Sequence, residues 1–214
     1  MTNNSTTFKI GITGVMGSGK SLVGHILKDL GVAVLDTDEV VHQLYHSTEV
    51  IQRVTEHFGP EILETASGET RISRAKLAQL VFNSPSEKQW LEALIHPLVR
   101  QKTEAFLASN ENTPVKTVLV PLLFESGSEG LYDATWAITV SDTEQLISRI
   151  QHRNPEWSHA DILARLNGQW SQAEKTKHAT VCIDNSESPD ITKGHVIETL
   201  QAMLPQGLWE TLSR

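Results

Sequence analysis

Short apolar runs alternate along the chain with longer segments in which apolar residues recur at helical spacing. Residues 8–13 form a β-rich run that stops at a glycine-rich turn, and residues 21–30 then follow the helical period. Helical patterns such as 143–153 and 160–172 separate the later runs. Those runs are 32–35, 117–120, 135–140 and 180–183. This alternation of strands and helices predicts an α/β fold built on a parallel sheet.

About 80 residues between the second and third predicted strands interrupt the alternation, because they contain no convincing strand. Their apolar residues follow helical spacing, and His96-Pro97 is typical of a helix start with proline in its first turn. The separate helical patterns lie around residues 50–58, 74–82, 87–95 and 98–107. The sequence therefore predicts a helical insertion between the second and third strands of the sheet.

Two groups of residues are expected at the carboxyl edge of this sheet. Pro121 cannot donate a ladder hydrogen bond, so the third strand should end near Val120 and leave residues 122–125 at the edge. Asp36 and Asp38 follow the second strand at the same edge. Open α/β sheets bind their ligands there.

The composition limits the classes of function. A length of 214 residues fits one compact domain with a smaller insertion, and a net charge of −8 argues against a broad nucleic-acid-binding surface. The longest apolar run, residues 118–124, is too short to cross a membrane, and residues 1–7 lack the features of a secretory signal. Cys182 is alone, so we expect a small core side chain in a cytoplasmic protein.

The strongest motif follows the first predicted strand. It reads Gly14-Val15-Met16-Gly17-Ser18-Gly19-Lys20-Ser21 and fits G-x-x-x-x-G-K-[ST] between a strand and a helix. In such a loop the glycines let backbone N–H groups approach phosphate oxygens, and the helix N-terminus favours negative charge. Lys20 reaches the β- and γ-phosphates and Ser21 ligates Mg²⁺. The motif predicts binding of a nucleoside triphosphate with Mg²⁺.

The loop alone does not separate a kinase from a nucleotide-dependent switch. A switch GTPase would carry Asp-x-x-Gly and Asn-Lys-x-Asp segments, and the sequence contains neither. A small-molecule kinase needs a carboxylate near the attacking hydroxyl, and Asp38 is the first candidate, followed by Asp36. Capping of the next helix is the alternative for both aspartates.

A kinase also needs cations over the transferred phosphoryl group. Arg149 and Arg153 are four residues apart, which places them on one face of a helix expected to begin near Asp142. Two guanidinium groups on one face suit bidentate phosphate binding, although an ordinary solvated helix face is the alternative. Arg165, on the following helical pattern, is a weaker candidate.

Together these segments resemble the dephospho-coenzyme A kinases, which complete coenzyme A by phosphorylating a ribose 3′-hydroxyl with ATP. The resemblance covers roughly residues 8–204 and, beyond the phosphate loop, rests on segments in a fixed order. These are Leu35-Asp36-Thr37-Asp38, Phe58-Gly59, Arg74 with Leu77 and Val81-Phe82, His96-Pro97, Val120-Pro121-Leu122-Leu123-Phe124-Glu125, Gln145 with Arg149 and Arg153, and Arg165 and Gln169 with Ile183-Asp184-Asn185.

The resemblance implies a P-loop NTPase fold of the nucleoside-monophosphate-kinase type, with a five-stranded parallel sheet flanked by helices. Residues 8–39 and 110–204 would form the nucleotide-binding core, with a lid around residues 149–169. Residues 40–109 would form the insertion that binds dephospho-coenzyme A. Another P-loop kinase of the nucleoside, nucleotide or shikimate type is the alternative, because the core alone does not distinguish them.

The resemblance also implies roles for single residues. Asp38 would act as base or orienter of the 3′-hydroxyl, Lys20 and the lid cations Arg149 and Arg153 would stabilise the transferred phosphoryl group, and Arg74 and His96 would contact the substrate. Glu125 would lie behind the residues that touch the reactants. The sequence departs from the family pattern in three places: Val15-Met16 replaces Gly-Ile, Thr37 replaces alanine, and Ser186 or Glu187 stands where glycine is common.

Overall fold

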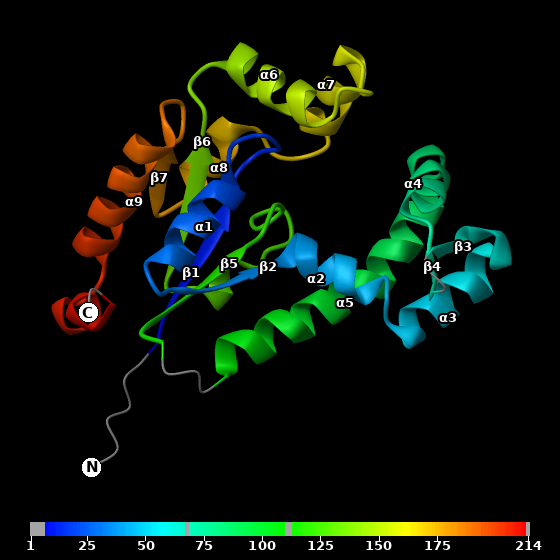
Figure 1. Cartoon of the computed structure of the whole chain (residues 1–214), viewed down its shortest axis with the longest axis horizontal. Helices are drawn as coiled ribbons and strands as arrows, with labels where there is room; N and C mark the ends of the chain where they lie inside the picture. The colour runs from blue at the N-terminus through cyan, green and yellow to red at the C-terminus, as the bar shows by residue number, and fades with distance from the viewer. Residues whose placement is uncertain (1–6, 67–68, 110–112, 213–214) are drawn as a thin grey trace. The chain divides into compact units, whose positions relative to one another are not determined.

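The computed structural model describes residues 7–66, 69–109 and 113–212. The chain divides into two compact units, which we call the core unit (Met1–Asp36 and Asn110–Arg214) and the insertion unit (Thr37–Ser109) (Figure 1). Residues 110–112, where the expected nucleotide-binding core resumes, and residues 67–68 of the expected insertion lie outside the described residues.

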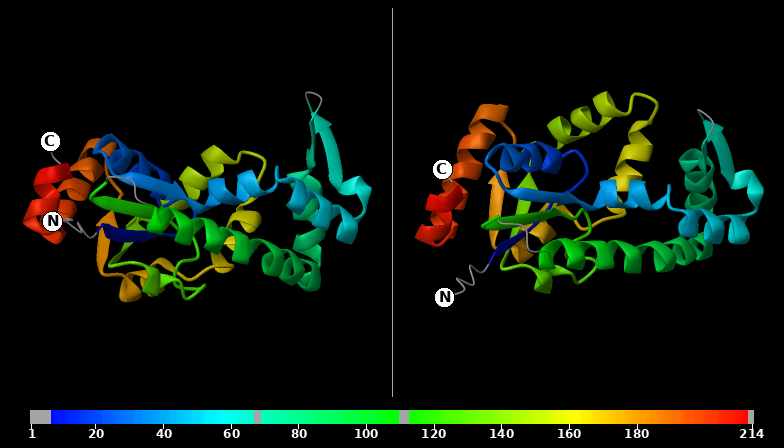
Figure 2. Two further views of the ribbon diagram at one scale, coloured as in Figure 1. Left: turned by 90° about the horizontal axis from the view of Figure 1, so that it is seen from below. Right: turned by 60° about the horizontal axis from the view of Figure 1, so that its bottom comes forward.

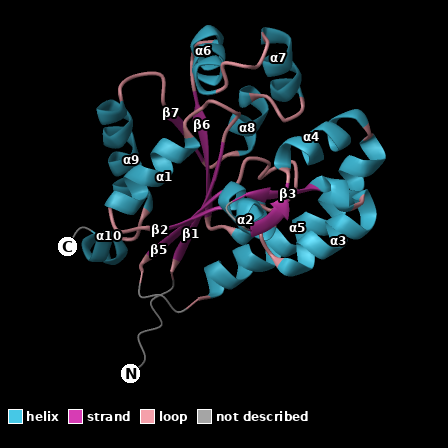
Figure 3. Cartoon of the chain, turned by 45° about the vertical axis from the view of Figure 1, so that its right-hand side comes forward, coloured by secondary structure: helices cyan, strands magenta, loops and turns pink. Residues whose placement is uncertain are grey.

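The core unit contains the predicted parallel sheet, whose strands are magenta in Figure 3. Its strand order is β2-β5-β1-β6-β7, and every neighbouring pair is parallel. The strands are β1 (Phe8–Thr13), β2 (Ala33–Asp36), β5 (Val115–Leu119), β6 (Ala134–Thr139) and β7 (Val181–Asp184). All five were predicted as strands, and β5 ends one residue before Val120 because Pro121 follows.

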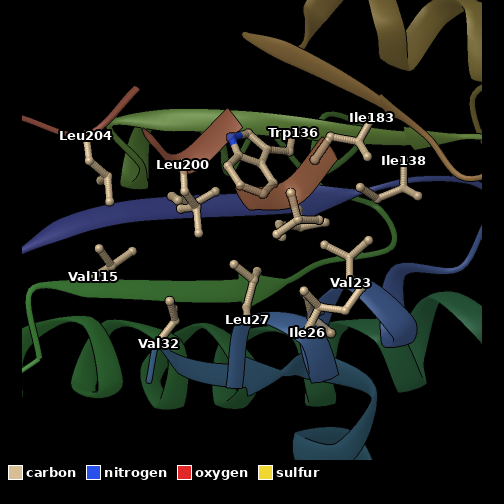
Figure 4. Packing of buried hydrophobic residues seen from close by; sticks show 14 residues of the cluster. Val23, Ile26, Leu27, Val32, Val115, Trp136, Ile138, Ile183, Leu200 and Leu204 are labelled. Atoms are coloured by element: carbon tan, nitrogen blue, oxygen red, sulfur yellow. The ribbon is translucent and has the colours of Figure 1, made fainter. Parts of the chain in front are cut away.

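Helices α1 and α9 pack against the sheet and against each other. Figure 4 shows Leu27 of α1, Leu200 of α9 and Trp136 of β6 in the same apolar cluster, and all three side chains are fully buried. Burial of each such side chain contributes about 1.5–3 kcal/mol. The helices of the core unit are α1 (Lys20–Asp29), η2 (Glu129–Leu131), α6 (Thr143–Arg153), α7 (His159–Asn167), α8 (Gln172–His178), α9 (Pro189–Met203) and α10 (Gln206–Leu212).

Two expectations for the core unit are wrong. The helical pattern over residues 160–172 is not one helix, because α7 ends at Asn167, with Gly168 as its C-cap, and α8 starts at Gln172. Cys182 is exposed rather than part of the core. It lies on β7, which is an edge strand of the sheet and is only partly covered along its length.

The insertion unit is mainly helical but contains a hairpin that was not predicted. Strands β3 (Leu63–Ala66) and β4 (Glu69–Ile72) pair antiparallel and appear as paired arrows in both views of Figure 2. Its helices are α2 (Thr37–Leu44), α3 (Thr48–Phe58), η1 (Pro60–Ile62), α4 (Arg74–Asn83) and α5 (Pro85–Ala108). Helix α5 runs through Pro97, so the predicted helix start at His96-Pro97 is also wrong.

Buried apolar residues on both sides of Pro97 explain why α5 does not end there. Leu91, Leu94 and Ile95 precede the proline and Leu107 follows it, and all four side chains are buried. Packing of these side chains offsets the missing backbone hydrogen bond of the proline. Within the described residues, no helix is both long enough and apolar enough to cross a membrane.

Candidate active site

The phosphate loop connects the end of β1 to the start of α1 in the core unit. Gly17 and Gly19 have φ values of 82° and 97°, in the left-handed region that glycine adopts without strain. A Cβ atom at Gly19 would lie 1.9 Å from Nδ2 of Asn185, and one at Gly17 would lie 2.7 Å from Cγ1 of Ile150. Both positions therefore require glycine for conformation and for space.

The polar side chains of the loop suit an anionic ligand. Nζ of Lys20 donates to the carbonyl oxygen of Gly14 at 2.7 Å, so its ammonium group is held at the loop. Ser21 is exposed in the first turn of α1. The Ser18 hydroxyl is buried without a hydrogen-bond partner among the described residues. A cation, hydroxyl groups and a helix N-terminus together form a phosphate-binding arrangement.

Asn185 braces this loop from the end of β7. Its Nδ2 donates to the backbone carbonyl of Ser18 at 2.8 Å, and its Oδ1 accepts from the Thr192 hydroxyl of α9 at 2.8 Å. Asn185 is 3% exposed and Thr192 is 0% exposed, so the link is shielded from water. Sequence reasoning placed Asn185 only in the family pattern; its position directly after the last strand, at the edge that carries the loop, was the available signal.

An apolar cluster joins the phosphate loop to α6 and α7. Val15 is 3% exposed and packs with buried residues of both helices, and Met16 lies against the same cluster. The other buried members are Val140, Leu146, Ile150 and Ile162. The two loop positions that depart from the family pattern are therefore the ones whose side chains contact the α6–α7 segment, residues 143–167.

Helix α6 carries the two arginines expected to bind phosphate. It begins as predicted, with the Asp142 side chain accepting from the backbone N–H of Glu144 at 2.9 Å, and it ends at Arg153. Arg149 is half-buried and Arg153 is exposed. Ile150, the residue after Arg149, packs against the loop, so this part of the α6 backbone lies beside the loop.

Two other candidates have structural partners in the core unit. The guanidinium carbon of Arg165 lies 4.0 Å from the ring centroid of Trp157, a cation–π contact within the α6–α7 segment. Glu125 forms a buried ion pair with Lys175, with an Nζ to Oε1 distance of 2.7 Å. Glu125 thus contacts a side chain that sequence reasoning did not select.

The remaining predicted residues lie in the insertion unit. Asp38 is exposed in the first turn of α2, two residues after Asp36 ends β2. Arg74, the first residue of α4, is exposed, and His96 is exposed on α5. Burial raises the pKa of the Tyr45 hydroxyl, and the charge of Arg74 opposes that rise. These side chains therefore lie on three different helices of the insertion unit.

The core unit has the P-loop kinase fold. Its sheet is parallel in the order β2-β5-β1-β6-β7, a phosphate loop follows the first strand, and helices pack on that loop. The sequence model of the dephospho-CoA kinase family matches residues 8–190, which include the whole insertion unit. The chain belongs to the dephospho-CoA kinase family.

Individual relatives agree with this assignment. The chain is 37% identical to a dephospho-CoA kinase of Geobacillus kaustophilus over 97% of its own length and 100% of that protein. Among solved structures, TT1252 from Thermus thermophilus has a TM-score of 0.78 at 33% identity, covering 93% of this chain and 98% of that one. Dephospho-CoA kinase from Campylobacter jejuni has a TM-score of 0.66 at 26% identity, covering 91% and 96%.

Proposed function

We propose that the chain transfers the γ-phosphoryl group of ATP to the ribose 3′-hydroxyl of dephospho-coenzyme A, giving coenzyme A and ADP. The observation that carries the proposal is the family match across residues 8–190, because it includes the insertion unit. The core fold alone is less informative: a shikimate kinase from Acinetobacter baumannii shares it, with a TM-score of 0.52 at 14% identity.

The phosphate loop would hold the triphosphate of ATP. Backbone N–H groups from residues 14–19 and the N-terminus of α1 would bind phosphate oxygens, and Lys20 would turn its ammonium group from the Gly14 carbonyl toward them. The exposed Ser21 hydroxyl fits Mg²⁺, a hard cation that prefers oxygen ligands. When bound, Mg²⁺ neutralises charge on the β- and γ-phosphates.

The α6–α7 segment would act as the lid. Its apolar contact with Val15 and Met16 supports a coupling between the loop and α6, the helix that carries Arg149 and Arg153. Closure would bring these guanidinium groups to the transferred phosphoryl group and exclude water, which strengthens their stabilisation of the developing charge. The reaction requires positioning rather than covalent catalysis by the protein.

The insertion unit would bind and orient the acceptor, dephospho-coenzyme A. Asp38 would accept a hydrogen bond from the 3′-hydroxyl, orient its oxygen toward the γ-phosphorus and take up its proton. Arg74 and His96 would contact the remainder of dephospho-coenzyme A. We also expect a cytoplasmic location, where ATP and the acceptor would be available.

The test measures ADP release with Mg²⁺·ATP and one acceptor at a time: dephospho-coenzyme A, AMP, uridine or shikimate. We expect dephospho-coenzyme A to give the highest kcat/KM, and Lys20→Met to remove that activity as the control for a contaminating kinase. Preference for another acceptor would assign the chain a different kinase activity. ADP release that is independent of every acceptor would instead favour an ATPase or a switch.

A further inference from the structure

Helix α8 carries a lysine that is buried at the carboxyl edge of the sheet. The Lys175 side chain is 1% exposed, and its Nζ lies 2.7 Å and 2.9 Å from the two carboxylate oxygens of Glu125. The same ammonium group donates to the carbonyl of Pro121 at 2.8 Å and to the Thr13 hydroxyl at 3.4 Å. Lys175 therefore links α8 to the ends of β5 and β1, next to Gly14.

Burial and the neighbouring carboxylate of Glu125 have opposite effects on the charge of Lys175. Burial lowers the pKa of its ammonium group, and the hydrogen bond and charge of Glu125 oppose that shift. A buried charge without its partner is strongly destabilising, so Lys175 and Glu125 depend on each other. The roles proposed above for the phosphate loop, the lid arginines and Asp38 assign no task to this ion pair.

Glu125 also holds the C-terminal end of the α6–α7 segment. The backbone N–H of Trp170, three residues after α7 ends, donates to Oε1 of Glu125 at 2.9 Å. The Trp170 ring packs against Phe124, with ring centroids 6.3 Å apart, and against His178 at 5.0 Å. The chain that returns from α7 is therefore fixed to the residue that pairs with Lys175.

Gln172, also on α8, holds the other end of the segment. Its Oε1 accepts from the backbone N–H of Val140 at 2.8 Å, and its Nε2 donates to the Val140 carbonyl at 3.0 Å. Val140 directly follows β6 and precedes α6 by three residues. Helix α8 thus fixes both ends of the α6–α7 segment. Gln172 holds the entry directly, and Lys175 holds the exit through Glu125.

We propose that Lys175, Glu125 and Gln172 are positioning residues for phosphoryl transfer, because they fix both ends of the segment that carries Arg149 and Arg153. The inference rests on the proposed function for the role of the two arginines. The anchoring acts together with the apolar cluster around Val15 and Ile150, which seats the middle of the segment on the phosphate loop. With the ends released, α6 would keep this apolar contact but present its arginines in many orientations.

The test compares Lys175→Met and Gln172→Leu with the matched control Lys177→Met. Lys177 is on the same helix and faces Glu174 at 3.8 Å, but its side chain is 72% exposed, so its loss should have little effect. Gln172→Leu leaves the ion pair intact and remains informative if Lys175→Met fails to fold. For each variant, kcat, the KM for ATP and backbone hydrogen exchange are measured well below the melting temperature.

We expect both anchor variants to lower kcat at least tenfold, to change the KM for ATP less than threefold, and to speed exchange in residues 143–167 but not in β1. Lys177→Met should match the wild type. Wild-type exchange in that segment, or faster exchange with wild-type kcat, in the folded anchor variants would overturn the inference. Hydrogen exchange is measured without an acceptor, so it tests the anchoring independently of activity. A wild-type protein that is inactive on dephospho-coenzyme A would refute the proposed function but would leave the exchange result intact.

Discussion

Replacement of Asn185 by alanine tests whether the phosphate loop is held from behind by the end of β7. The substitution removes the donor to the Ser18 carbonyl and the acceptor of the Thr192 hydroxyl, and it opens space beside Gly19. A buried polar group without a partner costs about 1–3 kcal/mol. The Thr192 hydroxyl can still donate to the Ser188 carbonyl at 3.3 Å, so the Ser18 carbonyl is the group that loses its hydrogen-bond donor, and we expect the free energy of unfolding to fall by about 1–3 kcal/mol.

The consequence for function is a less preorganised loop. We expect Asn185→Ala to weaken ATP binding about tenfold, which corresponds to about 1.4 kcal/mol. Thr192→Val is the matched control, because it loses the bonds to Asn185 and to the Ser188 carbonyl but leaves the bond from Asn185 to the Ser18 carbonyl. It should lower stability by about 1 kcal/mol and leave ATP affinity within about twofold of the wild type.

Thermal unfolding and isothermal titration with Mg²⁺·ATP measure the two quantities independently. The melting temperature should fall in both variants, whereas ATP affinity should fall only in Asn185→Ala. Wild-type ATP affinity in a folded Asn185→Ala protein would refute the bracing role. An equal loss of affinity in Thr192→Val would show that general destabilisation, rather than the contact with Ser18, controls binding.

Three further substitutions address the reacting groups. Lys20→Met should keep the fold by circular dichroism but lower turnover by at least about 10², because a cation at the phosphates is lost; wild-type turnover would contradict its role. Asp38→Asn should bind ATP almost normally while transfer collapses, and the reverse pattern in titration and single-turnover assays would argue against it as the orienting carboxylate. Ser21→Ala should raise the Mg²⁺ concentration for half-maximal activity about tenfold, by analogy with other lost ligand contacts; an unchanged Mg²⁺ titration would remove Ser21 from the metal site.

The sheet and the phosphate loop were predictable because local sequence specifies them. Each strand of the sheet lies in a short run of mainly apolar and β-branched residues, and the loop is a contiguous motif whose glycines meet local conformational needs. The Asp142 cap of α6 was equally visible, since capping depends on neighbouring residues. These features need no knowledge of distant contacts.

The errors came from elements that depend on tertiary packing. The β3–β4 hairpin mixes polar and apolar residues, so its strands have no strong local sequence pattern. The hairpin is stabilised instead by strand pairing and by contact with α3. Buried apolar residues on both sides of the proline, Leu94 and Leu107 among them, support α5 through Pro97 although proline alone predicts a break. Cys182 looked like a core residue because its strand is apolar, but strand order decides which faces are covered.

The candidate site shows the same division. Motif and family pattern selected Lys20, Ser21 and the α6 arginines directly. The side chains that support them, Lys175 and Asn185, are far in sequence from the groups they contact: Lys175 from Glu125, and Asn185 from Ser18. No sequence pattern indicated the contact between Lys175 and Glu125, and for Asn185 the available signal was its position directly after the last strand.

The most direct test of the central claim follows the fate of the γ-phosphoryl group itself. ATP labelled with ¹⁸O in the γ-phosphoryl group is incubated with Mg²⁺, dephospho-coenzyme A and the full chain, and the products are resolved by ³¹P NMR and mass spectrometry. We predict that the labelled phosphoryl group appears as a monoester on the ribose 3′-oxygen, with unlabelled ADP as the co-product. Label found in inorganic phosphate, or on any other hydroxyl of the acceptor, would contradict the account.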